Sequence, residues 1–459
     1  MTYIKKKLLL IILLIITAVL VISEIGKEAS YLEFIKNKIS AETKFKIKKY
    51  LLPYKTINSL EEIIKVIENT PLNLELRTKE KQEKIVFRGN RKINIFNDEK
   101  KLKIFTNVDQ ILAGINRRTP GSAYLEFFQD KLILSSSSGI IAYSNNIDDE
   151  NITFNQIKNN LNSIVNFESF KKQKMRQAFS IKDLLVFNNK IFVSYTNEVK
   201  NNCWNTSIAY AEMNLIELNF KILFEPKECI PEESELNEFN AHQSGGRMVS
   251  YDNDHILFTT GEYRLRWKAQ DKKSIFGKIL KININERNYE IISMGHRNPQ
   301  GLTFDKKNNL ILATEHGPRG GDEINLFKPK IDKIINFGWP ISSYGEHYND
   351  EKINEKKYEL YPLKKSHKNY GFVEPLKYFV PSIGISEITM YDEKKYIFSS
   401  MRSKNLYTLT LNEDNSLKKI DTIVIGERIR DLIYKKEQKK IILFLEDTAS
   451  IGIIENYKD

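Results

Sequence analysis

The stretch Phe304-Asp-Lys-Lys-Asn-Asn-Leu-Ile-Leu312 contains an aromatic residue, a polar turn and then a short run of strand-forming apolar residues. Two strand-forming runs separated by a few Asn, Asp, Lys or Gln residues are typical of a β-hairpin. The same pattern recurs along the chain. Its other copies span residues 128–134, 187–193, 251–258, 391–398 and 434–443. Six related hairpins predict an all-β chain that is built from one repeated sheet unit.

A third strand is expected after some of these hairpins, for example over residues 277–282 and 405–411. When such sheets stack radially they bury each other's faces, so six of them predict a six-bladed β-propeller. A β-sandwich is the alternative, but it does not explain six similar hairpins. We expect the propeller over residues 116–459, after an N-terminal extension or spacer over residues 25–115.

The extension shows short elements but no functional signal. A helix with a Ser cap and an acidic first turn is expected over residues 59–68. Strands are expected over residues 83–87, 93–96 and 102–105. One of these strands is a candidate to close the ring against the last blade.

Residues 1–24 are expected to be a signal anchor or a signal peptide. Three lysines at positions 5–7 precede an uncharged run from Leu8 to Ser23, and a positive flank of this kind stays in the cytoplasm. The run is short for a spanning helix, which needs ~20 residues, and an Ala-x-Ala cleavage site is absent. We expect a single-pass anchor in a bacterial inner membrane with the propeller in the periplasm. A cleaved signal and a soluble periplasmic protein are the alternative.

The two cysteines, Cys203 and Cys229, fit an exported chain. An oxidising compartment would let them form a disulfide. Two unrelated buried thiols are the alternative. A zinc site is disfavoured, because no His or further Cys lies nearby at ligand spacing.

The formal net charge of +12 raises the question of nucleic-acid binding. A strand-binding groove combines a basic track with aromatic residues on which bases stack. Here the lysines are spread along the whole chain, and no basic block is interleaved with aromatics. We therefore expect no nucleic-acid partner.

Two polar motifs stand out near the middle of the chain. They read Met294-Gly-His-Arg-Asn-Pro-Gln-Gly-Leu-Thr-Phe304 and Glu315-His-Gly-Pro-Arg-Gly-Gly-Asp-Glu-Ile-Asn325, followed by Gly338-Trp-Pro340 and Ser343-Tyr-Gly345. Together they resemble the soluble aldose dehydrogenases that depend on pyrroloquinoline quinone (PQQ), the glucose/sorbosone dehydrogenase family. The resemblance covers roughly residues 120–457, and it is strongest over residues 240–345 and 426–431.

The positions of the motifs in the expected blades place them at one end of the propeller. Strands alternate in direction from the axis outward, so the start of an innermost strand and the end of the second strand lie on the same face. Residues 241–247, 295–300 and 426–431 precede innermost strands, and residues 260–264, 315–319 and 400–404 follow second strands. We therefore expect all six segments at one mouth of the central channel.

Up to six guanidinium groups would reach this mouth: Arg247, Arg297, Arg319, Arg402, Arg428 and Arg430. Guanidinium suits planar anions, and PQQ is a flat tricarboxylate. For each arginine alone, a surface or inter-blade ion pair is the alternative.

The resemblance implies a set of PQQ contacts: Arg297, Asn298, Gln300, Arg402, Arg428 and Arg430. At Arg402 the better-known members carry Lys. It also implies a calcium ion on the backbone carbonyls of Gly317 and Pro318, and a hard cation on carbonyl oxygens is chemically reasonable.

The resemblance further implies a histidine base, and His242 fits it. Imidazole suits the role because its pKa lies near neutrality. The spacing before Gly246-Arg247 differs by one residue from some family versions, and Ala241 replaces an acid found in one branch. His296 and His316 are expected to pack or to support the site from behind.

Three functions are weighed. The first is a periplasmic quinoprotein dehydrogenase that oxidises the C1 hydroxyl of an aldose to a lactone and passes electrons to a quinone or cytochrome. The second is a non-enzymatic binding propeller of the same family. The third, hydrolysis by metal-bound water, is disfavoured because the sequence shows no evident ring of Asn, Asp and Glu ligands.

Overall fold

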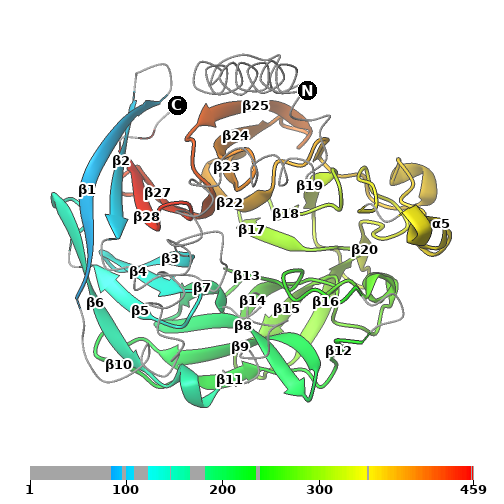
Figure 1. Ribbon diagram of the computed structural model, residues 1–459, viewed down its shortest axis with the longest axis horizontal. Helices are drawn as coiled ribbons and strands as arrows, with labels where there is room; N and C mark the ends of the chain where they lie inside the picture. The colour runs from blue at the N-terminus through cyan, green and yellow to red at the C-terminus, as the bar shows by residue number, and fades with distance from the viewer. Residues whose placement is uncertain are drawn as a thin grey trace, which may run out of the picture. The chain divides into compact units, whose positions relative to one another are not determined.

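Five of the six predicted hairpins contain parts of the first two strands of a four-stranded antiparallel sheet, and residues 251–258 contain the turn and part of the second strand. These sheets are the blades of a propeller (Figure 1). The computed structural model describes residues 84–95, 100–107, 122–144, 146–165, 181–233, 238–348, 351–455 and 457. The predicted signal segment (1–24) and the predicted helix (59–68) lie outside these residues. None of the helices in the described part of the chain is long and apolar enough to cross a membrane.

The first three blades follow one another along the chain. Blade 1 consists of β3 (Ala123–Phe128), β4 (Lys131–Ser136), β5 (Ile141–Ser144) and β6 (Asn151–Asn159). Blade 2 consists of β7 (Ile181–Phe187), β8 (Lys190–Lys200), β9 (Cys203–Glu212) and β11 (Lys221–Phe224). Blade 3 consists of β13 (Gly245–Ser250), β14 (His255–Thr260), β15 (Lys278–Asn283) and β16 (Tyr289–Met294).

The last three blades complete the set. Blade 4 consists of β17 (Pro299–Asp305), β18 (Leu310–Glu315), β19 (Asp322–Phe327) and β21 (Lys377–Phe379). Blade 5 consists of β22 (Ile385–Asp392), β23 (Lys395–Ser400), β24 (Asn405–Leu411) and β25 (Leu417–Val424). Blade 6 consists of β26 (Ile429–Lys435), β27 (Lys440–Leu445), β28 (Ser450–Ile454) and β2 (Lys100–Asn107).

The innermost strands form a closed ring in the described part of the chain. Each packs against the next in the order β3, β7, β13, β17, β22 and β26, and β26 packs against β3. The second strands are buried almost throughout, as in β18, whereas the outer strand β25 is mostly exposed. Burial between neighbouring blades thus supplies the core.

The ring is closed by an early strand. β2 pairs antiparallel with β28, for example Ile104 with Gly452, and so becomes the outermost strand of blade 6. β1 (Lys84–Ile95) pairs with β2 on one side and with β6 of blade 1 on the other. The expectation that a strand of the N-terminal extension closes the ring is therefore confirmed, and residues 84–107 belong to the sheet structure.

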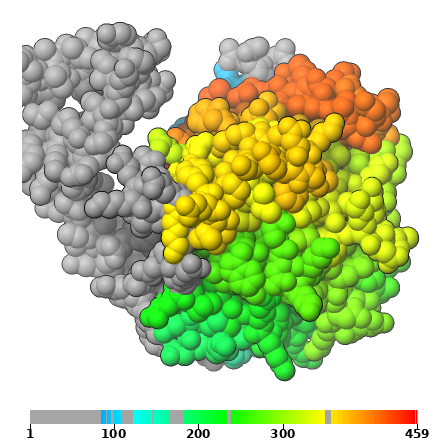
Figure 2. All heavy atoms as spheres, turned by 90° about the vertical axis from the view of Figure 1, so that its right-hand side faces the viewer, coloured from blue at the N-terminus to red at the C-terminus, as the bar shows by residue number. Residues whose placement is uncertain are grey.

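Smaller elements decorate the blades. They are β10 (Glu217–Leu218), β12 (Ile230–Pro231), β20 (Ile335–Asn336), the 3-10 turns η2 (Leu161–Ser163), η4 (Arg266–Gln270) and η5 (Lys368–Tyr370), and the helix α5 (Glu351–Leu360). The region around α5, yellow in Figures 1 and 2, belongs to the long insertion between β19 and β21 and stands at the edge of the molecule.

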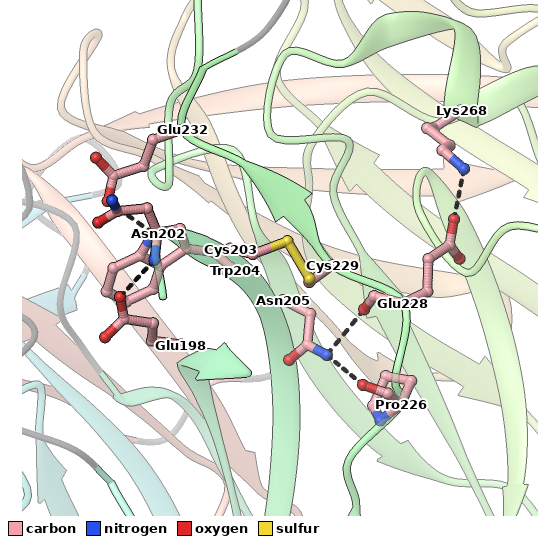
Figure 3. Close-up of a disulfide and its surroundings, with 10 residues drawn as sticks. All are labelled: Glu198, Asn202, Cys203, Trp204, Asn205, Pro226, Glu228, Cys229, Glu232 and Lys268. Carbon is pink, nitrogen blue, oxygen red and sulfur yellow. Dashed lines mark hydrogen bonds and ion pairs between the residues drawn. A yellow bond between two sulfur atoms is a disulfide. The ribbon is translucent and has the colours of Figure 1, made fainter. Parts of the chain in front are cut away.

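The two cysteines form a disulfide, as predicted. Cys203 begins β9 and Cys229 directly precedes β12, with their Cα atoms 5.4 Å apart (Figure 3). β12 pairs with the start of β9 at Ile230 and Trp204. The bond therefore fastens the loop after β11 to the first residues of β9.

Candidate functional site

The structure brings the predicted mouth residues to one end of the inner strands. His242, Arg297 and Arg428 lie just before β13, β17 and β26, whereas Gly317 and Arg402 lie just after β18 and β23. These second strands run antiparallel to the inner strands beside them. Chain segments that precede an inner strand and segments that follow a second strand therefore meet on the same rim.

A β-bulge interrupts the pairing near the start of five of the six inner strands in the described part of the chain. The register shifts fall around Lys182, Gly246, Gln300, Ser386 and Arg430. A bulge adds one unpaired residue and redirects the side chains beside it, and bulges are common next to functional sites. These bulges explain how the side chains of neighbouring residues on one strand can point to different parts of the molecule.

Arg297 is buried, and its backbone and side chain are both fixed. Its N–H donates to Glu315 Oε2 at 2.6 Å, and its Nη1 donates to the carbonyl of His316 at 2.8 Å. The guanidinium carbon also lies 5.5 Å from the ring centre of Trp339. The two predicted motifs and Trp339 thus hold one arginine side chain between them.

The Gln243 amide joins three charged groups beside Arg297. With its oxygen and nitrogen assigned by their neighbours, Gln243 accepts from Arg297 Nη2 at 2.9 Å and Arg264 Nε at 2.8 Å, and donates to Glu262 Oε1 at 2.6 Å. Burial raises the pKa of Glu262 to about 7 against the opposing effect of the arginines. Its Oε2 has no hydrogen-bond partner among the described residues.

Arg428 and Arg430 share one buried carboxylate. Glu446 accepts from Arg428 Nε at 3.2 Å and from Arg430 Nε at 2.5 Å. Arg428 also donates to the carbonyl of Met401 at 3.4 Å, and the neighbouring Arg402 is exposed. Two guanidinium groups against one carboxylate leave a net positive charge at this side of the mouth.

The remaining predicted residues line the same rim. Asn298 Oδ1 accepts from the N–H of Gly245 and from Gln300 Nε2, each at 3.1 Å. The Gly317 N–H donates to Asp322 Oδ1 at 3.1 Å. Gly317 and Pro318 are buried, and their carbonyl oxygens accept no hydrogen bond from the described residues.

His242 lies in the loop before β13, and its side chain is exposed to solvent. Its N–H donates to Asn240 Oδ1 at 2.9 Å. Although solvent reaches the ring, the surrounding protein atoms and the charges of Lys182, Arg430 and Arg264 lower the pKa of His242 to about 4. The imidazole is therefore neutral near pH 7 and free to accept a proton.

The two other histidines of the motifs lie behind the rim. His296 is fully buried between Ser293 Oγ at 2.8 Å and Glu315 Oε1 at 3.1 Å. Burial lowers the pKa of His316, and the charges of Arg297, Arg430 and Arg428 act in the same direction. His296 packs as expected from the sequence.

The prediction for Arg247 is wrong. Its Nη1 lies in the channel, 2.9 Å from Asp183 Oδ1 and 2.6 Å from both Glu387 Oε2 and Asp431 Oδ1. Oxygens of the three carboxylates lie within 4.8 Å of one another, close enough to hold a metal ion, but the guanidinium takes that place. Arg247 is therefore a structural residue of the axis and not a mouth arginine.

Two cations at the mouth were not predicted, namely Lys182 and Arg264. Lys182 had a signal in the sequence, because Ile181-Lys-Asp-Leu-Leu185 of β7 repeats Ile429-Arg-Asp-Leu-Ile433 of β26. Lys182 thus holds in blade 2 the position that Arg430 holds in blade 6, two blades away around the ring. Arg264 lies in the expected mouth segment 260–264, but nothing in its local sequence distinguishes it.

Comparison with known proteins agrees with this fold. The family model for glucose/sorbosone dehydrogenases matches residues 185–454. The chain belongs to this family. The match runs from β7 of blade 2 to β28 of blade 6 and so includes every predicted site residue.

Relatives of this glucose/sorbosone dehydrogenase family member include the aldose sugar dehydrogenase YliI of Escherichia coli, 28% identical over 269 residues, which are 53% of this chain and 67% of the relative. The uncharacterized protein slr1608 of Synechocystis is 34% identical over 188 residues, 37% of this chain and 42% of the relative. The chain thus matches less than half of the length of slr1608.

Solved structures share the fold. The PQQ-bound aldose sugar dehydrogenase from Streptomyces coelicolor superposes with a TM-score of 0.54 at 16% identity, over 82% of this chain and 99% of that chain. At this identity the likeness extends to the fold alone.

Proposed function

We propose that this protein is a PQQ-dependent dehydrogenase of the periplasm that oxidises the C1 hydroxyl of an aldose sugar to a lactone. The observation that carries the proposal is an excess of positive charge around a neutral histidine at one mouth. The terminal nitrogens of Arg430 and the whole guanidinium of Arg402 have no carboxylate partner among the described residues. Such a mouth needs an anionic ligand.

PQQ fits the groups that are present. Its three carboxylates match the guanidinium groups of Arg297, Arg402, Arg428 and Arg430, and its ring polar atoms match the amides of Asn298 and Gln300. When bound, PQQ supplies the acceptor for the two electrons and the hydrogen that leave the sugar carbon. The protein's part is to hold that group by charge and by shape.

Calcium fits the carbonyl oxygens of Gly317 and Pro318, which accept no hydrogen bond from the described residues, because this ion prefers oxygen ligands. The surrounding charge opposes it, since Arg297, Arg428 and Arg430 all act on the adjacent His316. We therefore propose that calcium binds together with the anionic cofactor, where it polarises a cofactor oxygen.

His242 is the proposed base. A general base must be unprotonated at working pH and must reach the reacting hydroxyl. Its pKa of about 4 keeps the ring unprotonated at neutral pH, and its exposed side chain leaves room for a substrate. This pKa is lower than the near-neutral value expected from the sequence, and the negative charge of bound PQQ would raise it. His242 would take the proton of the sugar hydroxyl, while the amides and guanidinium groups around it orient the sugar and the cofactor.

The periplasm and the membrane anchor over residues 1–24 remain proposals. The Cys203–Cys229 disulfide supports export, because disulfides persist in oxidising compartments. In that compartment a quinone or a cytochrome would accept the electrons. A non-enzymatic binding propeller is the second candidate, because the same cationic mouth would also hold an anionic partner.

Titration of PQQ into the purified protein, with and without calcium, tests the proposal. We expect saturable binding with a bound-quinone absorption spectrum, and aldose-dependent reduction of an artificial electron acceptor. Arg402→Gln should weaken binding, whereas Lys190→Gln on β8 should not. If the wild type binds no PQQ in the presence of calcium, the enzyme assignment fails and the binding propeller replaces it.

A further inference from the structure

Two cations beside His242 are not needed by the proposed cofactor contacts. They are Lys182 at the start of β7 and Arg264 in the segment after β14. Both act on the His242 imidazole, and Arg430 acts with them. Because a base must touch the hydroxyl that it deprotonates, charges that surround His242 also surround the substrate.

Lys182 is held at the mouth by close packing. It occupies the bulge of β7, and its stem passes over Gly246 near the start of β13. A Cβ built on Gly246 would lie 2.4 Å from Lys182 Cβ, so this position requires glycine. No described carboxylate pairs with the Lys182 ammonium, and burial and the charge of Arg430 lower its pKa to about 7. A bound anion would raise that pKa again and keep the ammonium charged.

Arg264 is held there by a strained backbone. It has a φ of 67°, and the preceding Tyr263 has a φ of 51°. Consecutive non-glycine residues in the left-handed region are costly, and such strain collects at functional sites. Arg264 Nε bonds to Gln243, and its guanidinium lies 5.4 Å from the ring centre of the exposed Tyr348.

Two acids act on Arg264, and neither neutralises this pair. Glu238 already forms ion pairs with Arg266 and Lys357. Arg264 shares the charge of Glu262 with Arg297 and Arg266, and that carboxyl is buried behind the Gln243 amide. Lys182 and the terminal nitrogens of Arg264 therefore bring positive charge to the substrate side of the mouth. A neutral sugar would leave both unpaired.

We propose that the preferred substrate is a negatively charged aldose, whose anionic group is bound by Lys182 and Arg264 while its C1 hydroxyl faces His242. This assignment rests on the proposed dehydrogenase function and adds the class of sugar to it. A carboxylate at C6, as in a hexuronate, and a phosphate at C6 have the same chemistry toward these two cations.

Steady-state kinetics of the PQQ-loaded protein test this proposal with glucuronate, glucose 6-phosphate and glucose. We expect kcat/KM for at least one charged sugar to exceed that for glucose by about tenfold or more, the usual worth of a charge-assisted contact. Added salt should reduce this preference. The arm with the larger value identifies carboxylate or phosphate as the group bound.

Four variants test which side chains produce the preference for a charged sugar. Lys182→Gln and Arg264→Gln should each lower the ratio of charged to neutral kcat/KM by roughly tenfold or more. Lys190→Gln and Arg287→Gln should leave the ratio unchanged. Arg287 is a close match, because it too has a positive φ of 61° and lies over a tyrosine, Tyr210, at 6.0 Å.

The outcomes separate the two proposals. Oxidation of glucose with no preference for either charged sugar overturns the substrate assignment and leaves the dehydrogenase intact. Weaker PQQ binding in Lys182→Gln and Arg264→Gln, measured by absorbance titration, with an unchanged sugar ratio would assign both cations to the cofactor and also overturn it. If no sugar of either class is oxidised by the PQQ-loaded protein, the dehydrogenase function itself fails.

Discussion

Arg247 Nη1 lies 2.6 Å from Asp431 Oδ1, which joins β13 of blade 3 to β26 of blade 6 on opposite sides of the ring. Arg247 Nε also donates to the carbonyl of Gln300 on β17 at 2.6 Å. Asp431 Oδ2 accepts from the N–H of Leu125 on β3 at 2.7 Å. With Asp183 on β7 and Glu387 on β22, the cluster links all six described inner strands across the axis.

Removing this arginine is expected to destabilise the protein strongly. Arg247→Ala leaves three buried carboxylates without their cation, and breaking a buried ion pair from one side typically costs about 3–5 kcal/mol. Arg247→Lys keeps the charge but loses the forked geometry, so its loss should be smaller. Denaturant titration measures the free energy of unfolding. Lys419→Ala, in an exposed pair with Asp421, should change it little; equal effects of all three would refute the axial role.

The same cluster should make stability depend on pH. Burial raises the pKa of Asp183 to about 7 and that of Glu387 to about 8, against the opposing pull of Arg247. A carboxyl with a raised pKa binds its proton more tightly in the folded state. Its stabilising contribution is complete below about pH 4 and is lost as the pH rises through 7 to 8.

We therefore expect the contribution of this cluster to the Tm to fall from pH 5 to pH 8. Glu387→Gln resembles the protonated carboxyl and should flatten the dependence of Tm on pH. Glu290→Gln, in a partly exposed pair with Lys281, should leave the slope as it is in the wild type. A slope that Glu387→Gln does not alter would contradict this prediction.

Substitution of the proposed base should affect turnover more than cofactor binding. His242→Ala is expected to lower kcat by ~10²–10⁴-fold, the usual contribution of general-base catalysis, with PQQ affinity nearly unchanged. Arg297→Ala and Arg430→Ala should weaken PQQ binding first, because each removes a charge-assisted contact to a carboxylate. Parallel kinetics and absorbance titrations compare the two effects. Loss of both properties in His242→Ala would point to a disturbed fold instead.

The protonation of the His242 imidazole can be measured independently of enzyme activity. Since the charges of Lys182, Arg430 and Arg264 and the surrounding protein lower the pKa of His242, its ring should remain neutral at pH 5.5 in the cofactor-free protein. NMR titration of the histidine ring protons, with His242→Gln to assign the signal, measures this pKa. A midpoint near 6.5 would show that these charges do not act on the ring.

Calcium and PQQ should bind cooperatively. The charges of Arg297, Arg430 and Arg428 act on His316, next to the carbonyl groups of Gly317 and Pro318, so calcium alone should bind weakly. PQQ carboxylates would offset that charge, and by linkage calcium must then raise PQQ affinity by the same factor. We expect at least about a tenfold rise in calorimetric titrations. Equal calcium affinity with and without PQQ would remove the carbonyls of Gly317 and Pro318 from the cofactor site.

The disulfide should stabilise the fold without forming part of the mouth. It closes a loop of 26 residues, for which the chain-entropy model gives about 3 kcal/mol. The double variant Cys203→Ser with Cys229→Ser should lose stability of that order and keep its PQQ affinity. Thiol titration of the unfolded, non-reduced wild type should find no free thiol. Two free thiols would show that the bond is absent in solution.

Much of the candidate site could be predicted from the sequence because its residues lie in short motifs. The order of strands within a blade fixes which segments reach a given rim, so Arg297, Gly317, Arg402 and Arg428 could be placed there. Lys182 was missed although residues 181–185 repeat residues 429–433. A lysine at the start of a strand is usually exposed to solvent, so its residue type alone did not indicate a place at the mouth. Arg264 was missed because its place depends on a backbone with a positive φ, and no glycine at that position indicates such a backbone in the sequence.

The sequence by itself determined the blades and the family, since hairpins and motifs are local patterns. It favoured the cysteine pair, because the chain has two cysteines and fits export, and the structure decided between a disulfide and two separate thiols. Only the tertiary structure decided which side chains face the mouth and which face the axis. A one-residue bulge moves a strand residue to the other face, and the partners of Arg247 lie at positions 183, 387 and 431. Residues so distant along the chain become neighbours only when the ring closes, with β2 paired to β28.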